Sequence, residues 1–438
     1  FRYDGSSKFA KKNRWGFFPS ISLGWRISSE DFMKYYSDHI GDLKLRATYG
    51  VLGNQDIDPY QYLTVYSSGT NVYGFNNASV SGAGFTYGNT DLKWETTHTY
   101  NLGIDAAFLN NSLVATFDYF LKKTSDILIT PEIPSAFGTT LSKTNAGAMQ
   151  DQGWEFNLSY RFKTGQFAHS LSVNLSDNWN KVTKFEGGEQ ISTIDDISRI
   201  IRVGLPFNAY YGYKVAGYFK SVEDIETSSL PVGINASDLR PGDVKFVDRN
   251  HDGVIDAKDR YVLGTAFPRY NFGFIYNVSY KNFDFSAFIQ GVGKRDMMVR
   301  GELVEPFHEN YSYVIYRHQL DFWTPTNPDA RWPRLVATGS TSDENNYRNS
   351  SNLYLLDGKY MRLKNISLGY TLPSAWINKL GIQKFRIYVN AQNLLTLSRN
   401  SWIDPESSEF DSNMSGASNS ARNYPSLRYY GFGLDIVF

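Results

Sequence analysis

The stretch that decides the fold is Trp154-Glu155-Phe156-Asn157-Leu158-Ser159-Tyr160-Arg161-Phe162. Apolar or aromatic side chains occupy every second position, and charged, amide or hydroxyl side chains occupy the positions between them. Successive side chains of a β-strand point to opposite faces, so this pattern predicts a strand with one apolar and one polar face.

The same two-residue period recurs along the whole chain and predicts eleven strands. They lie near residues 17–25, 43–51, 100–108, 113–121, 154–162, 169–179, 272–280, 283–291, 360–372, 385–394 and 428–438. Most of them are about nine to eleven residues long, which is the length of a tilted strand that crosses a bilayer.

The connections between the predicted strands alternate in length. Short or modest links cover residues 26–42, 109–112, 163–167, 281–282 and 373–384, and long links cover residues 52–99, 122–153, 180–271, 292–359 and 395–427. Short turns at one end and long loops at the other are typical of bacterial outer-membrane barrels, whose long loops face outward. We therefore expect residues 1–438 to form part of one transmembrane antiparallel β-barrel domain. A soluble β-sandwich also alternates, but it does not segregate its loops in this way.

The composition supports a membrane barrel and excludes several other classes. Aromatic residues make up 16% of the 438 residues, although the mean hydropathy is −0.40. Tyr and Trp prefer the membrane–water boundary. Lys+Arg and Asp+Glu are both 44, which gives no indication of nucleic-acid binding. The chain has no cysteine, so disulfide frameworks and thiolate sites are excluded.

The predicted strand directions indicate that the barrel needs further strands. By loop parity the first and last predicted strands both run inward, and an antiparallel barrel cannot close between two such strands. Open sheet edges are not tolerated in lipid. We therefore expect the rest of the barrel as an N-terminal segment or a separate chain, with Phe1 in an outer loop. The first residues show no signal peptide.

Several segments resemble a known family. They are Gly50–Ile57, Asn89–Thr96, Pro241–Phe246, Phe322–Pro325 and Arg331–Leu335, together with Asp357–Tyr370, which continues into Val389–Leu394. With the terminal Phe438, this combination is similar to the SusC/RagA branch of TonB-dependent outer-membrane transporters, and the resemblance covers essentially the whole chain.

The resemblance implies a large plugged barrel, of which eleven strands would be about half of 22. It also implies an N-terminal plug and a segment that contacts the TonB complex, and neither is in this sequence. Members of the family usually work with a SusD-like surface lipoprotein. Their ligands are usually oligosaccharides and sometimes peptides.

One motif has the spacing of a Ca²⁺-binding loop. Side-chain oxygens stand at positions 1, 3 and 5, Gly253 at position 6, a backbone carbonyl at 7, and acidic residues at 9 and 12. The predicted ligands are Asp248, Asn250, Asp252, Val254, Asp256 and Asp259. We expect a structural Ca²⁺ that stiffens the outer loop 180–271, against the alternative of a solvated turn that holds no metal.

The loop 292–359 is rich in aromatic residues, which stack well on sugar rings. Tyr311, Tyr313, Trp323 and Trp332 are the candidate substrate-binding residues. The alternative, which we favour for most loop aromatics, is that they pack the loop against itself or a partner.

No catalytic motif is present, so the sequence predicts no enzyme. We expect the polar strand faces, with residues such as Glu155, Arg161, Asn174, Asp284 and Gln290, to line the interior. The leading hypothesis is import of large nutrients. A surface adhesin and a secreted glycan hydrolase are the alternatives, and fractionation with the membrane discriminates the last.

Overall fold

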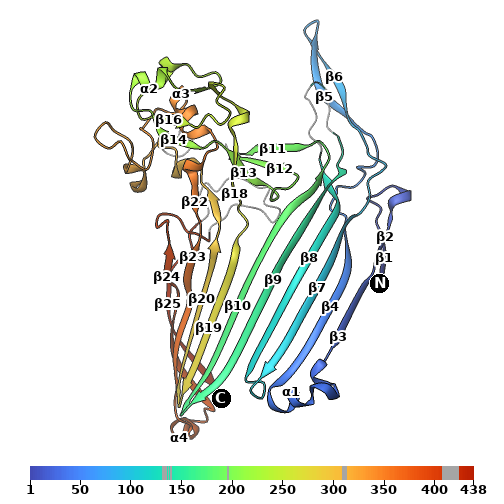
Figure 1. Ribbon diagram of the computed structural model, residues 1–438, viewed down its shortest axis with the longest axis vertical. Helices are drawn as coiled ribbons and strands as arrows, with labels where there is room; N and C mark the ends of the chain where they lie inside the picture. The colour runs from blue at the N-terminus through green and yellow to red at the C-terminus, as the bar shows by residue number, and fades with distance from the viewer. Residues whose placement is uncertain (131–135, 137, 139–140, 195–196, 308–312, 407–423) are drawn as a thin grey trace. The chain divides into compact units, whose positions relative to one another are not determined.

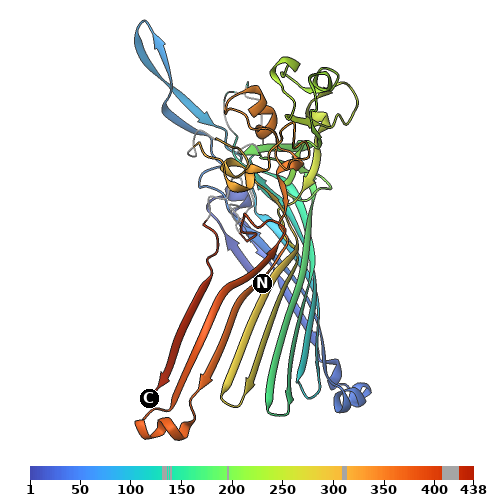
Figure 2. The same ribbon diagram turned by 90° about the vertical axis from the view of Figure 1, so that its left-hand side faces the viewer.

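The computed structural model describes residues 1–130, 136, 138, 141–194, 197–307, 313–406 and 424–438. Among these residues, eleven strands are hydrogen-bonded in chain order (Figures 1 and 2): β3 (Ser20–Trp25), β4 (Gly41–Asn54), β7 (Glu95–Phe108), β8 (Leu113–Ile129), β9 (Thr144–Thr164), β10 (Phe167–Phe185), β19 (Arg269–Tyr280), β20 (Phe283–Lys294), β23 (Tyr360–Thr371), β24 (Lys384–Ser398) and β25 (Tyr429–Val437). The pairings β3–β4, β4–β7, β7–β8, β19–β20, β20–β23, β23–β24 and β24–β25 are antiparallel.

Each predicted strand is confirmed, but several bounds were wrong. The range 17–25 is divided at Pro19, because β2 (Trp15–Phe18) pairs with β1 (Arg2–Gly5) instead of joining the large sheet. The predicted loop 122–153 is too wide, because β8 and β9 are 17 and 21 residues long. The outer ends of β8 and β9 lack the apolar alternation that predicts a strand. A ladder of backbone hydrogen bonds does not require an apolar face.

The chain divides into two compact units, which are described separately. The first comprises residues 1–159, 176–190 and 201–207, and the second comprises residues 160–175, 191–200 and 208–438. β9 and β10 run through both units. Among the described residues, no helix is long and apolar enough to cross a membrane.

In the second unit, residues in register across five strands give the sheet one apolar face. Val278, Phe285, Leu368, Val389 and Phe432 are successive partners across β19, β20, β23, β24 and β25. Val389 and Phe432 are 52% and 68% exposed. A row of exposed apolar side chains in water would be costly, so this face is suited to lipid.

The opposite face of the same strands is polar. One residue away from the apolar row, Asn277, Ser286, Ser367, Asn390 and Gly431 are successive partners in the same five strands. Amide and hydroxyl groups on this face are suited to contact with water or with a polar solute.

The first unit repeats the two-faced arrangement. Leu23, Ala47, Leu102 and Tyr119 are in register across β3, β4, β7 and β8. Leu23 and Leu102 are 65% and 63% exposed. One residue away, on the other face, Gly24, Arg46, Gly103 and Asp118 are in register across the same four strands.

Aromatic side chains gather near the short-turn end of the second unit. Phe167 stacks on Tyr280 at 4.3 Å, and Phe283 contacts Tyr370 at 4.7 Å. Aromatic belts of this kind mark the membrane–water boundary in outer-membrane barrels.

Within each unit the short connections lie at one end of the strands and the long ones at the other (Figure 1). In the first unit, α1 (Lys34–His39) and the turn 109–112 lie opposite the hairpin of β5 (Val65–Phe75) and β6 (Ala78–Thr86). In the second unit, the turns 165–166 and 281–282 and helix α4 (Ser374–Ile377) lie opposite the long loops.

The long loops contain secondary structure that the sequence pattern did not predict. Besides β5 and β6, they hold β11 (Glu189–Ile194), β12 (Ile197–Arg202), β13 (Ala209–Gly212), β14 (Val215–Tyr218), α2 (Val222–Glu226), β15 (Leu230–Pro231), β16 (Val244–Phe246), β17 (Val254–Ile255), β18 (Tyr261–Gly264), β21 (Asp296–Met298), α3 (Thr341–Asp343) and β22 (Leu355–Asp357).

The segments Gly50–Ile57 and Asn89–Thr96 meet in the first unit, at the outer end of β4. Val51, Ile57, Leu92 and Trp94 are buried there in one cluster with Phe9 and Phe18. The indole N–H of Trp94 donates to the carbonyl of Arg14 at 3.1 Å. These two segments therefore build a small core that holds the base of the first long loop.

Candidate functional site

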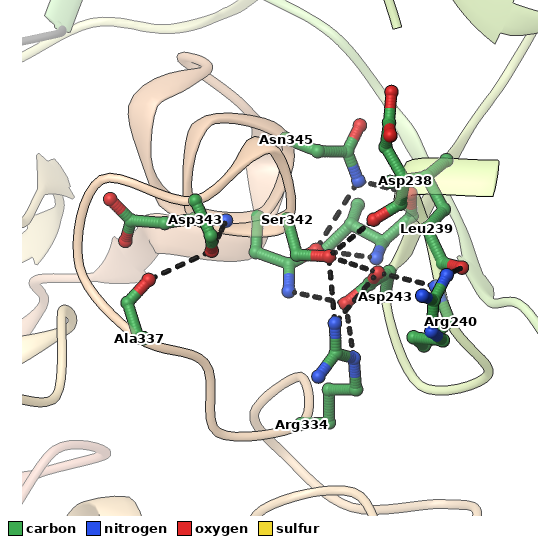
Figure 3. A network of polar contacts seen from close by, with 12 residues as sticks. Asp238, Leu239, Arg240, Asp243, Arg334, Ala337, Ser342, Asp343 and Asn345 are labelled. Carbon is green, nitrogen blue, oxygen red and sulfur yellow. Dashed lines mark hydrogen bonds and ion pairs between the residues drawn. The ribbon is translucent and has the colours of Figure 1, made fainter. Parts of the chain in front are cut away.

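Two long loops of the second unit converge on a buried polar network centred on Asp243 (Figure 3). The Asp243 side chain has no exposed surface. Its carboxylate accepts hydrogen bonds from Arg334 Nε at 2.7 Å, Ser342 Oγ at 2.7 Å and Asn346 Nδ2 at 2.9 Å. The backbone N–H of Arg240 donates to it at 2.8 Å. A buried carboxylate is tolerated when it is paired and hydrogen-bonded in this way.

The network joins two sequence motifs at close range. The backbone N–H of Arg334 donates to the carbonyl of Gly242 at 3.0 Å. Gly242 has φ of 94°, and a Cβ at this position would lie 2.3 Å from the Trp323 ring. Only glycine combines this left-handed backbone with so close an approach. The segment Pro241–Phe246 and the segment Arg331–Leu335 are therefore structural partners.

Of the predicted substrate-binding residues, Trp332 lies in a core. It is 3% exposed, and its indole N–H donates to the carbonyl of His318 at 2.8 Å. The His318 ring stacks on Trp402 at 4.2 Å. Burial lowers the pKa of His318, although its hydrogen bond to the Leu303 carbonyl opposes that shift. The Trp332 and Trp323 rings both pack against the loops' own residues.

Tyr313 is the predicted substrate-binding residue that stands on the surface, with 65% exposure. It lines a cavity of about 530 Å³ with Phe307 and residues 335–338. Tyr311 lies outside the described residues. Substrate contact by any of the four aromatic residues stays a prediction.

The acidic loop predicted to bind Ca²⁺ is held by hydrogen bonds from its own backbone. Asp248 accepts from the N–H groups of His251 at 2.7 Å and Gly253 at 3.0 Å. Asp259 is fully buried and accepts from the N–H of Asp256 at 2.7 Å. The pKa of Asp248 is lowered, first by the hydrogen bond from the Ser229 hydroxyl and also by these N–H groups.

A lysine stands close to two of the predicted ligands. Lys258 Nζ lies 3.7 Å from Asp252 Oδ2 and 3.4 Å from Asp256 Oδ2. Asn250 Nδ2 donates to Asp252 Oδ2, and Val254 N to Asp252 Oδ1. In the part of the chain that the structure describes, no group of three His, Cys, Asp or Glu residues is arranged to hold a metal. A Ca²⁺ would have to replace the ammonium and several N–H donors, so calcium binding stays a prediction.

A second cavity, of about 520 Å³, adjoins the acidic loop. It is lined by residues 231–234, 255–257 and 339–341, together with Tyr213, Glu344 and Asn349. Its walls offer hydroxyl, amide and carboxylate groups, which are the groups that orient polar ligands.

On the polar faces of the sheet, each unit holds an arginine between two aspartates. Arg46 pairs with Asp105 at 2.8 Å and with Asp118 at 2.9 Å. In the second unit, Arg386 pairs with Asp284 at 2.6 Å and with Asp435 at 3.2 Å.

Glycines make room for both arginines. A Cβ at Gly103 would lie 2.6 Å from the Arg46 guanidinium, and one at Gly369 would lie 2.5 Å from that of Arg386. These clusters join neighbouring strands and give the polar face fixed charges.

The sequence analysis did not predict the Asp243 network, although Pro241-Gly242-Asp243 belongs to one of the segments that carry the family resemblance. It also missed the hairpin β5–β6. The turn of this hairpin, Asn76-Asn77, has positive φ at both residues, and Asn is favoured in such two-residue turns.

Comparison with known proteins identifies a family. The family model described as "TonB dependent receptor-like, beta-barrel" matches residues 1–394. TonB-dependent receptor P3 of Formosa agariphila is 33% identical, with 100% of this chain and 43% of that protein covered. TonB-dependent receptor SusC of Bacteroides thetaiotaomicron is 30% identical, with 100% of this chain and 41% of that protein covered.

Among solved structures, a chain of the RagAB peptide transporter matches with a TM-score of 0.75 and 24% identity. The match covers 99% of this chain and 44% of that one. At this identity the similarity concerns the fold. The chain spans less than half the length of each of these relatives.

Proposed function

The chain belongs to the family of TonB-dependent receptor β-barrels, which are integral to the bacterial outer membrane, and on this premise we propose that it takes part in TonB-dependent import of oligosaccharides. In this proposal the outer loops receive the ligand together with a SusD-like surface lipoprotein. The TonB complex supplies the energy for this transport. Transport involves no catalytic step by this chain.

The observation that supports import most directly is the two-faced sheet. An apolar row such as Leu368–Val389–Phe432 is suited to lipid, and the adjacent polar row Ser367–Asn390–Gly431 is suited to a hydrated interior. A secreted glycan hydrolase has no need of such an exposed apolar row, so the two-faced sheet favours a membrane barrel over that alternative.

The outer loops supply a rigid frame for ligand recognition. The buried Asp243 network fixes two loops, and the two cavities of about 520 and 530 Å³ open beside them. Tyr313 presents an exposed aromatic ring, which can stack on a sugar. A peptide is the alternative ligand, because the RagAB peptide transporter has a similar fold.

The proposal is tested by uptake into intact cells that express the full-length protein. We expect labelled oligosaccharides of the right class to accumulate, and we expect a protonophore to abolish the accumulation. Uptake of peptides with no uptake of any glycan would replace the oligosaccharide assignment, and absence of energy-dependent uptake of either would refute import.

Two variants test the part played by the loops. Tyr313→Ala should raise the ligand concentration needed for half-maximal uptake, because it removes the exposed ring. Tyr35→Ala is the matched control, since Tyr35 is 74% exposed in helix α1, at the short-turn end of the first unit. Equal effects of the two variants would contradict ligand contact by Tyr313.

A further inference from the structure

A groove crosses the apolar face of the first unit near its short-turn end. Trp25, Leu45, Ile104 and Phe117 are in register across β3, β4, β7 and β8, one row nearer that end than the apolar row described above. Side chains of the two rows enclose a groove of about 610 Å³. Because this face of an outer-membrane barrel contacts lipid, the groove is open to an acyl chain.

The groove has a small residue at its centre and a rigid floor. Ala47 pairs with Leu23 on one side and Leu102 on the other, and both larger side chains line the groove beside it. Behind the floor, on the polar face, the two ion pairs of Arg46 join β4 to β7 and β8. The floor is therefore held in one shape without a ligand, which lowers the entropic cost of binding one.

A polar recess of about 780 Å³ begins where the groove ends. Trp25 lines the groove, and the next residue, Arg26, lines the recess with other residues of the links 26–42 and 109–112. The Trp25 indole N–H donates to Glu30 Oε1 at 2.9 Å, so this side chain connects the groove to a carboxylate of the recess. Trp with one apolar and one polar contact is typical of the membrane–water boundary. The recess therefore lies at the depth of lipid headgroups.

The recess carries charges of both signs. Arg26 and Asp42 form an ion pair at 2.6 Å and so neutralise each other. Lys34, Asp31 and Asp38 also line the recess, and within the described residues these three form no ion pair. A lysine ammonium suits a phosphate, and carboxylates suit a primary ammonium, which donates up to three hydrogen bonds. The recess is thus complementary to a headgroup that contains both a phosphate and an ammonium.

From these features we propose that the groove and the recess together bind one phospholipid with a phosphate–ammonium headgroup, such as phosphatidylethanolamine. An acyl chain lies in the groove, the phosphate at Lys34, and the ammonium at Asp31 and Asp38. The short-turn end faces the periplasm, so the lipid comes from the inner leaflet. This site goes beyond the proposed function, because it does not depend on what the barrel transports.

The test measures lipid retention by native mass spectrometry of the full-length protein in detergent. Phosphatidylethanolamine, phosphatidylcholine and phosphatidylglycerol are supplied in equal amounts, and the wild type should retain the first in preference to the others. Ala47→Phe fills the groove and should weaken lipid binding by about tenfold or more. Val389→Phe is the matched control, because it adds bulk to the apolar face of the second unit; it should leave retention unchanged.

Two changes in the recess separate the phosphate contact from the ammonium contact. Lys34→Gln should weaken binding of all three lipids, because each contains a phosphate. Asp31→Asn combined with Asp38→Asn should remove the preference for phosphatidylethanolamine over phosphatidylcholine, whose quaternary ammonium donates no hydrogen bond. Lys379→Gln is the control, since Lys379 is an exposed lysine just after helix α4 and should have no effect.

The outcomes distinguish this site from the proposed function. Equal retention of the three lipids by the wild type, or a preference for either of the other two, would overturn the headgroup assignment. Retention by Ala47→Phe equal to that by Val389→Phe would overturn the groove. Import is measured separately by uptake into cells, so either result leaves the proposed function standing, and a failure of uptake leaves the lipid site standing.

Discussion

Removal of the Asp243 carboxylate should loosen the outer loops of the second unit without unfolding the strands. In Asp243→Ala, the Arg334 guanidinium loses its ion pair, and the Ser342 and Asn346 donors lose a fully buried acceptor. Breaking a buried ion pair from one side costs about 3–5 kcal/mol. The Arg334 side chain is only 25% exposed, so water compensates for little of this loss.

Hydrogen exchange of the full-length protein in detergent measures this local stability. At about 1.4 kcal/mol for each factor of ten, protection of amides in 240–246 and 331–346 should fall by roughly two to four orders of magnitude. Amides in β23 and β24 should keep their protection, because the network lies in the loops.

Two further variants make the test specific. Asp238→Ala removes an exposed carboxylate from the same loop and should change protection by less than about 0.5 kcal/mol. Asp243→Leu combined with Arg334→Leu should cost less than the sum of the two single changes, since neither buried charge is left unpaired. Protection in Asp243→Ala within tenfold of that in Asp238→Ala would refute the reasoning.

Three other expectations concern the same loops. Gly242→Ala should destabilise them by about 1–3 kcal/mol, because the added methyl group meets the Trp323 ring at a left-handed φ; similar hydrogen-exchange protection of Gly242→Ala and wild type would contradict this. Calorimetry should detect Ca²⁺ binding to the full-length protein that is weakened by Asp252→Ala and strengthened by Lys258→Met, which removes the competing ammonium; no heat of binding would remove the calcium prediction. Burial lowers the pKa of His318 in the folded loop, so the unfolded loop binds a proton at a higher pH than the folded loop does. The stability of the folded loop should therefore be lost as the pH falls below about 6.5. Limited proteolysis from pH 7.5 to 5.5 should show this loss, and His318→Gln should abolish it.

The sheet was predictable because its signal is local. Each strand shows its apolar face within a window of nine residues, as Trp154–Phe162 does, and the tight turns follow directly from the strand spacing. The outer ends of β8 and β9 were not predictable by this rule, because side chains there lack the apolar alternation.

The loop site was not predictable because its contacts are not local. Asp243 meets Arg334, Ser342 and Asn346 across 91, 99 and 103 positions of sequence. Composition likewise could not show that Trp332 is buried and Tyr313 is exposed, since an aromatic residue in a loop can be either. The hairpin β5–β6 had a local signal in Asn76-Asn77, but its irregular alternation concealed the strands on either side.

The central claim is that alternate residues of these strands face lipid and a hydrated interior. The chain has no cysteine, so single spin labels can be placed at Leu368, Val389 and Phe432 on the apolar face and at Ser367 and Asn390 on the polar face. In the full-length protein in bilayers, the first three labels should collide mainly with dissolved oxygen and the other two with a water-soluble nickel complex. Equal accessibility to both reagents at neighbouring positions would contradict a membrane-spanning barrel.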